Sequence, residues 1–146
     1  SYTIIRNPWD LCTSAFRYLK IDKNGYAKFE NNYDVNSAGE YPFEKFLENY
    51  NSIPSLRDYA FDSSGNQLVT KIYKLEEFSI KQLETDINDF INTNIDFSRD
   101  YRFNDDIKEN ATVKDKHFKE YYTSQWMIDK VEKIYQTDIK IGNYKF

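Results

Sequence analysis

Arg6 and Ser14 are the residues of this 146-residue chain whose types and spacing point most directly to a chemistry. Arg6 follows the apolar run Tyr2–Ile5, which predicts a strand buried on both faces. Asn7 and Pro8 then suit the N-cap and the first position of a helix. An arginine at the carboxyl end of a parallel strand can bind a phosphate bidentately, and the helix N-terminus beside it also favours an anion. Ser14, about two turns into that helix, can add a hydroxyl, so the spacing predicts a phosphate site.

The same residues allow a structural interpretation. Arg6 can instead form an ion pair with Asp10, and Ser14 can be a small residue that merely packs against its neighbours. The local sequence leaves both interpretations open.

Composition argues against several classes of function. The formal net charge is −4 with both signs intermixed, which argues against a nucleic-acid-binding surface. The four glycines are far apart, so a glycine-rich phosphate loop is not expected, and one His with one Cys makes a His/Cys metal cluster improbable. No apolar run approaches the length of a membrane span. The single cysteine, Cys12, cannot form an internal disulfide and favours a reducing, cytoplasmic location.

The pattern of elements predicts one α/β domain over residues 1–146, because strands and helices alternate. Strands are expected at Tyr2–Ile5, Asp58–Phe61 and Gln67–Leu75, and helices at Pro8–Leu19, from Tyr41 to Tyr50, at Ile80–Asn92 and after Thr123. We expect Tyr2–Ile5 to pair in parallel with the strand near Gln67–Leu75. Between the last two strands, Asp62–Asn66 has the composition of a turn.

The helix near residue 80 has a distinct start signal. Ser79 and Gln82 have the spacing of a capping box, in which each side chain bonds a backbone N–H of the other residue. A periodic apolar set then predicts the buried face of this helix, namely Leu83, Ile87, Phe90 and Ile91.

Four segments, in order along the chain, carry a resemblance to a known family. Arg6-Asn7-Pro8 followed by Ser14 and Tyr18 looks like R-[DN]-P-x-x-x-x-x-S-x-[FY], and Leu68–Phe78 is similar to a strand ending in a [YF]-E-[DN]-L type motif. Asn110–Thr123 resembles a loop of the form N-x-S-x-x-[KH]-x-x-[YW]-[RK]-x-[YF]-[YF]-[TD], and Ile141–Phe146 resembles an F-G-Y-x-F terminus. Together they resemble the sulfotransferases, especially the carbohydrate-type group.

The resemblance implies a cofactor, a fold and an activity. The cofactor would be 3′-phosphoadenosine 5′-phosphosulfate, with Arg6 and Ser14 on its 3′-phosphate and with Lys114 and Lys116 in a loop that closes over it. The fold would be a partial P-loop-NTPase-like, three-layer α/β arrangement with a short parallel sheet. The activity would be the transfer of sulfonate to a hydroxyl acceptor, with carbohydrate as the expected class. His117 lies in the loop region and is expected to be an exposed residue without a catalytic role.

In the family, the 5′-phosphosulfate loop, K-x-x-[ST]-[ST], and the general base lie upstream of the arginine strand. The resemblance therefore implies that this chain corresponds to a C-terminal portion of a sulfotransferase domain and is inactive by itself, with its catalytic residues unknown. The alternative is a non-catalytic nucleotide-binding or interaction module that keeps the fold. A kinase-like P-loop protein is a third option, which the lack of a P-loop disfavours.

Overall fold

The structure, a computed structural model, describes residues 1–21, 42–50, 54–97 and 116–146, with side chains up to Arg17 in the first range. Within these residues the protein is mixed α/β, with a sheet of two parallel strands, β1 (Tyr2–Ile5) and β2 (Lys71–Lys74). The register pairs Tyr2 with Lys71 and Ile5 with Lys74, so the predicted parallel pairing is confirmed. The helices are α1 (Pro8–Ile21), α3 (Phe43–Asn49), α4 (Leu56–Ala60), α5 (Ile80–Ile91), α6 (Gln125–Ile134) and α7 (Gln136–Gly142), with the short 3₁₀ helix η3 (Phe118–Tyr121).

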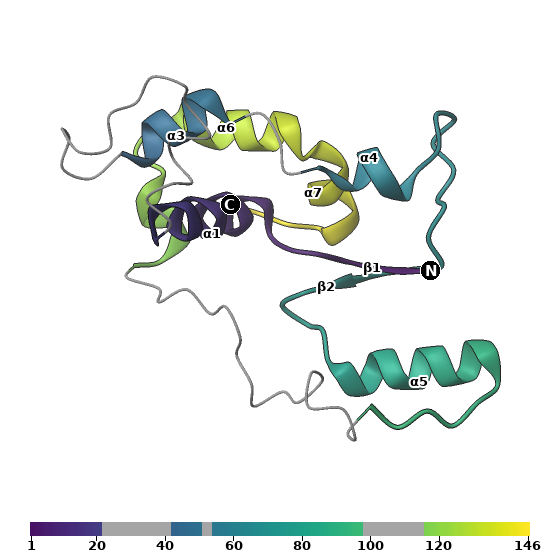
Figure 1. Cartoon of the computed structure of the whole chain (residues 1–146). Coiled ribbons are helices and arrows are strands. Elements are labelled where there is room, and N and C mark those ends of the chain that lie inside the picture. Colours follow the sequence, from purple (N-terminus) through teal and green to yellow (C-terminus); the bar gives the residue numbers. More distant parts are fainter. Residues whose placement is uncertain (22–41, 51–53, 98–115) are drawn as a thin grey trace.

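The sheet lies between two unequal layers (Figure 1). Helices α1, α3, α4, α6 and α7 lie on one side of it, and α5 lies alone on the other. No helix among the described residues combines the length and the apolar character that crossing a bilayer requires.

The larger hydrophobic core joins α1, α3, η3 and α6. Its buried members are Trp9, Cys12, Phe16, Phe43, Phe46, Leu47, Tyr50, Tyr121, Tyr122, Met127, Val131 and Tyr135. The helices predicted near Pro8 and Tyr41 thus both bury apolar residues in one core. The tyrosine hydroxyls are satisfied inside this core, because Tyr50 and Tyr135 share a hydrogen bond of 2.7 Å and Tyr122 donates to the Trp9 carbonyl at 2.9 Å.

A smaller core connects the sheet to α4. Ile5 packs with Leu56 and Ala60, and all three are buried. Asp138 of α7 is also buried, and its carboxylate accepts a 2.7 Å hydrogen bond from the Leu56 backbone N–H at the start of α4. Asp138 thereby satisfies one of the N–H groups that a helix start leaves without an internal partner.

Three expectations about the elements are corrected. Residues 58–60 belong to helix α4 rather than to a strand, because Asp58 accepts hydrogen bonds from both the backbone N–H and the hydroxyl of Ser55 and so closes a helical first turn. The turn at Asp62–Asn66 is present, but it leads back to a single antiparallel bridge, Phe61 to Gln67. The last helical region, expected as one helix after Thr123, begins at Gln125 and divides into α6 and α7.

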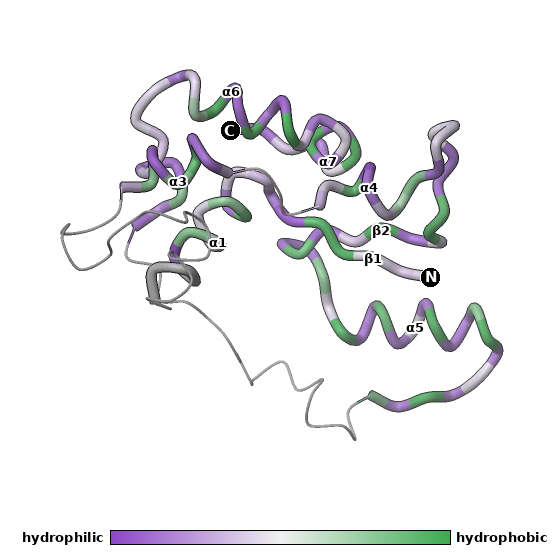
Figure 2. Tube along the Cα trace, turned by 45° about the horizontal axis from the view of Figure 1, so that its top comes forward, coloured by the Kyte–Doolittle hydropathy of each residue, from purple (hydrophilic) through white to green (hydrophobic). Residues whose placement is uncertain are grey.

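Burial of β1 and α5 is also less than the pattern predicts. In β1 only Ile5 is buried, while Ile4 keeps 42% of its surface exposed. Helix α5 starts at the predicted position, with the Ser79 hydroxyl accepting from the Gln82 N–H, but the Gln82 side chain donates to Asp86, so only this half of the expected capping box is seen. The helix also has no buried residue. Figure 2 shows hydrophobic residues interspersed with hydrophilic ones along α5, which lies beside the sheet. A sheet of two strands is too narrow to cover the apolar face of α5, so Phe90 stays 65% exposed.

This difference in burial predicts unequal costs for two phenylalanine truncations. Phe46→Ala removes a ring that is 2% exposed in the larger core and should destabilise the chain by about 3–5 kcal/mol. Phe90→Ala should change the free energy of unfolding by less than about 0.5 kcal/mol. Guanidinium unfolding of both variants tests this, and equal losses would show that the outer face of α5 is covered.

Asp138 predicts a pH dependence. Burial raises the pKa of its carboxyl from 3.8 to about 6. As the pH rises from about 4 to about 6, the unfolded chain loses this proton before the folded chain does, so the contribution of Asp138 to stability falls across that window. Asp138→Asn keeps an oxygen acceptor for Leu56 without the titration. Relative to the natural chain, it should therefore gain about 1–2 kcal/mol between pH 4.5 and pH 7. Urea unfolding at both pH values checks this, and a difference between the two proteins that does not change with pH would contradict it.

Candidate functional site

Arg6 lies immediately after β1, at the carboxyl end of a parallel strand. The side chain of Asn7 caps α1, because its Oδ1 accepts from the backbone N–H groups of Trp9 and Asp10 at 3.1 and 3.4 Å. The expected N-cap at Asn7 and first helical position at Pro8 are therefore confirmed. The end of β1 and the start of α1 together fix the position of Arg6, whose side chain extends along α1 toward Ser14.

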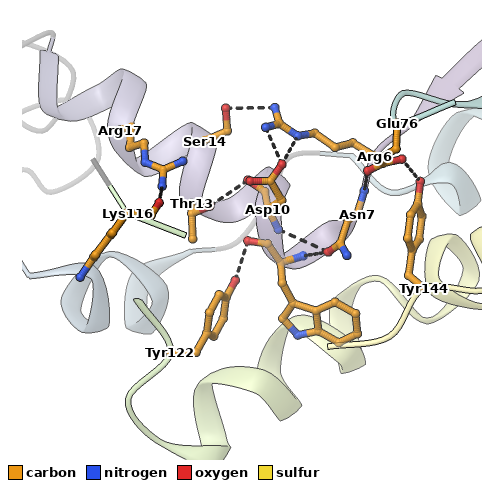
Figure 3. A network of polar contacts seen from close by, with 11 residues as sticks. Arg6, Asn7, Asp10, Thr13, Ser14, Arg17, Glu76, Lys116, Tyr122 and Tyr144 are labelled. Carbon is orange, nitrogen blue, oxygen red and sulfur yellow. Dashed lines mark hydrogen bonds and ion pairs between the residues drawn. The ribbon is translucent and has the colours of Figure 1, made fainter. Parts of the chain in front are cut away.

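Arg6 and Ser14 meet, as their spacing predicts. The Arg6 Nη1 donates to the Ser14 hydroxyl at 3.1 Å (Figure 3). Asp10 lies between them in the sequence and accepts from Arg6 Nε at 2.9 Å and from Nη2 at 2.6 Å. We call these three residues the Arg6 cluster. The ion pair with Asp10 that the structural interpretation expects is therefore present, and Arg6 contacts Ser14 as well.

The Arg6 cluster is half-buried. The side chains of Arg6 and Asp10 are 22% and 15% exposed. Such an ion pair is shielded from water only in part. The hydrogen bond from Arg6 Nη1 to the Ser14 hydroxyl also holds the guanidinium along the side of α1. The arrangement can therefore present the remaining guanidinium donors and a hydroxyl to a small anion.

The turn after β2 closes this end of the sheet. Glu76 accepts from the Asn7 backbone N–H at 2.7 Å and from the Tyr144 hydroxyl at 2.9 Å. Burial, and then the neighbouring Glu76 carboxylate, raise the pKa of Tyr144, so its hydroxyl keeps its proton and donates. Glu76 thus joins the end of β1, the end of β2 and the C-terminal segment.

Arg17 is a basic residue near the cluster that sequence reasoning missed. It lies one turn beyond Ser14 on α1 and is buried, with Nη2 donating to the Lys116 carbonyl at 2.6 Å and Nε donating to the Tyr121 hydroxyl at 3.3 Å. Its guanidinium also lies over the Tyr121 ring, 5.0 Å from the centroid. The signal available in the sequence was the i, i+3 spacing from Ser14, which places both residues on one side of the helix.

The two predicted lysines are placed differently. Lys114 lies outside the described residues. The Lys116 backbone is held beside Arg17, but its amine lies 4.1 Å from the centre of the Tyr121 ring and points away from Arg6 and Ser14 (Figure 3). Lys116 is therefore near α1 through its carbonyl and does not converge with the Arg6 cluster through its charge.

His117 and Cys12 have structural surroundings. The exposed His117 caps η3, with its Nδ1 accepting from the Lys119 N–H at 3.4 Å and its own N–H donating to Glu120 at 2.7 Å. Cys12 is fully buried, and burial raises the pKa of its thiol to about 12. A thiol protonated at neutral pH is a poor nucleophile. The described residues also contain no group of three or more His, Cys, Asp or Glu side chains placed to hold a metal ion.

The candidate site is thus the Arg6 cluster at the carboxyl end of β1, with Arg17 buried one turn farther along α1. It offers a partly exposed guanidinium and a hydroxyl, which are groups that can bind a small anion. In comparisons with family models, curated proteins and solved structures, nothing was found that matches this chain.

Proposed function

We propose that this chain binds the 3′-phosphate of 3′-phosphoadenosine 5′-phosphosulfate and belongs to a sulfotransferase that transfers sulfonate to a hydroxyl acceptor, with carbohydrate as the favoured class. The observation that carries the proposal is the 3.1 Å contact between Arg6 Nη1 and the Ser14 hydroxyl beside a helix that starts at the end of a parallel strand. α/β folds bind ligands at this end of their strands.

The guanidinium retains capacity for a ligand. An arginine side chain has five N–H donors, and the bonds to Asp10 and Ser14 use three of them. Within the described residues the other two have no protein partner, so they are available to phosphate oxygens. The Ser14 hydroxyl accepts from Arg6 and can donate its own proton to the same phosphate.

Asp10 sets the strength expected of this site. Its carboxylate neutralises the guanidinium on one side, so a phosphate that binds Arg6 is also repelled by Asp10. Binding through the Arg6 cluster alone should therefore be weak. Arg17 adds a positive charge near the cluster, although its direct bonds go to the Lys116 carbonyl and Tyr121.

The contacts of Glu76 support the proposal that this α/β arrangement is a sulfotransferase-like fold in particular. Three of the four segments that resemble the family meet at this carboxylate, which bonds Asn7 of the first segment and Tyr144 of the last while belonging to the second. The parallel pairing of β1 with β2 is consistent with a P-loop-NTPase-like sheet. Segments that resemble one family and lie far apart in the chain thus converge beside the Arg6 cluster.

The first test of the proposal is Arg6→Ala. Adenosine 3′,5′-bisphosphate, which keeps the 3′-phosphate, should bind the natural chain weakly, and Arg6→Ala should remove about 1.5–3 kcal/mol of its binding free energy because a charge-assisted bond is lost. Calorimetry measures both affinities. Arg57→Ala, on the exposed surface of α4, is the matched control and should bind like the natural chain. Adenosine 5′-monophosphate lacks the 3′-phosphate, so its binding should not respond to Arg6→Ala. Equal affinity of Arg6→Ala and the natural chain for the bisphosphate would exclude Arg6 from the site.

A second variant tests the competing carboxylate. Asp10→Asn removes the negative charge from the Arg6 cluster but keeps an oxygen that can accept from Arg6. The bisphosphate should then bind roughly threefold to tenfold more tightly, which corresponds to about 1 kcal/mol for one charge interaction near the surface. The same calorimetric titration measures this, and weaker or unchanged binding would show that Asp10 does not oppose the ligand.

The alternative function is a non-catalytic interaction module, and one observation favours it. Arg6 is already bonded to Asp10 and Ser14 without any ligand, which is what a purely structural connection between β1 and α1 requires. In that case Arg6→Ala would lower the free energy of unfolding while the natural chain showed no bisphosphate binding at all.

A further inference from the structure

Both peptide groups that flank Arg6 are held by consecutive residues of the turn after β2. The Leu75 N–H donates to the Ile5 carbonyl at 2.7 Å and so holds the peptide before Arg6. The Glu76 carboxylate accepts from the Asn7 N–H at 2.7 Å and so holds the peptide after it. Because peptide groups are planar, holding these two planes restricts both backbone dihedral angles of Arg6. The direction in which the Arg6 side chain leaves the backbone is restricted with them.

The two contacts differ in kind. The strand register ends with Ile5 opposite Lys74, and the bond from Leu75 extends this ladder through backbone atoms that any residue except proline has. The Asn7 N–H lies one residue farther on and is bonded by a side chain, the carboxylate of Glu76. The identity of residue 76 therefore decides whether the second peptide of Arg6 is held.

The Glu76 carboxylate is itself held by Tyr144, whose hydroxyl donates to its second oxygen at 2.9 Å (Figure 3). The Tyr144 backbone is fixed, because its N–H donates to the Ile139 carbonyl at 3.0 Å and because Asn143 before it adopts the left-handed conformation with φ 50°. The Tyr144 ring lies so close to Gly142 that a β-carbon at Gly142 would collide with it. Tyr144 is thus a firm support for the carboxylate.

The Arg6 side chain needs such support. A free arginine side chain populates many rotamers, and a partly exposed ion pair such as that with Asp10 stabilises one of them only weakly. We propose that Glu76 and Tyr144 are positioning residues for Arg6, which hold its guanidinium in the direction where it can bind an anion beside Ser14. Because it concerns the same site, this role rests on the proposed function.

Charge alone would give Glu76 the opposite effect. Its carboxylate is bonded to the residue next to Arg6, so its negative charge opposes a phosphate there. Glutamine at this position separates the two effects, because it has no charge but keeps an oxygen for the Asn7 N–H and an amide that can donate to the Tyr144 oxygen. Alanine removes the charge and both hydrogen bonds.

The first experiment is an NMR titration of the full chain with adenosine 3′,5′-bisphosphate. Glu76→Ala should weaken binding by about threefold to tenfold, the effect of losing a hydrogen bond. Glu76→Gln should bind at least as tightly as the natural chain. Tyr144→Phe, which removes only the hydroxyl, should weaken binding by about twofold or more. Glu77→Ala is the matched charge control, since the side chain of Glu77 is 70% exposed and pairs with Lys74 instead, and it should not weaken binding.

A second measurement needs no ligand and separates this role from the proposed function. The hydrogen exchange rate of the Arg6 Nε–H, which donates to Asp10 at 2.9 Å, reports how firmly the side chain is held. Glu76→Ala should raise this rate by about threefold or more, and Glu76→Gln should leave it unchanged. The Arg17 Nε–H, which donates to Tyr121 beside the larger core, is the internal control because a general loosening of the fold would raise its rate as well.

The two measurements distinguish the possible failures. If the natural chain does not bind the bisphosphate, the proposed function fails, and the exchange rate of Arg6 alone decides the positioning role. Three results would each overturn that role: binding by Glu76→Ala as tight as that of the natural chain, an unchanged exchange rate at Arg6, or an equal rise at Arg17. If Glu76→Ala does not fold, Tyr144→Phe is compared with the natural chain by the same criteria.

Discussion

The packing of helix α1 is the constraint on which both the fold and the candidate site depend. One side of α1 presses Trp9, Cys12 and Phe16 into the larger core, so the rotation of the helix about its axis is determined by apolar burial. The residues of the Arg6 cluster, Arg6, Asp10 and Ser14, are polar and recur at every fourth position. Because the two sets lie on different sides of the helix, the core holds the guanidinium and the hydroxyl at the surface beside the end of β1.

The two-stranded sheet and α5 are the least buried parts of this fold. Two parallel strands bury Ile5 against α4 but leave Ile4, Leu75 and most of the apolar side of α5 exposed. Parallel sheets are normally covered on both faces. The region around β2 therefore depends on polar contacts, such as those that Asp86 of α5 accepts from Lys71 and Tyr73, more than on a dry interior.

Local rules were sufficient for much of the fold. Asn7 and Ser79 cap their helices as their positions predict, and Asn92 ends α5 in the left-handed conformation that asparagine tolerates. These features depend on contacts within a few residues. The strand prediction at Asp58–Phe61 was wrong because two contacts stabilise a helix start there. Ser55 donates to Asp58 within the same turn, and the Leu56 N–H donates to the carboxylate of Asp138, which is distant in the sequence.

The sequence by itself determined that Arg6 and Ser14 lie on one side of a helix that follows a strand, because helical geometry brings side chains at this spacing together. Only the tertiary structure decided how their charges are balanced. Asp10 occupies two guanidinium nitrogens, Arg17 turns inward to hold the Lys116 carbonyl, and the Lys116 amine lies over Tyr121. The contacts of Arg17 join segments about 100 residues apart in the chain, and no local pattern encodes the distance between such groups.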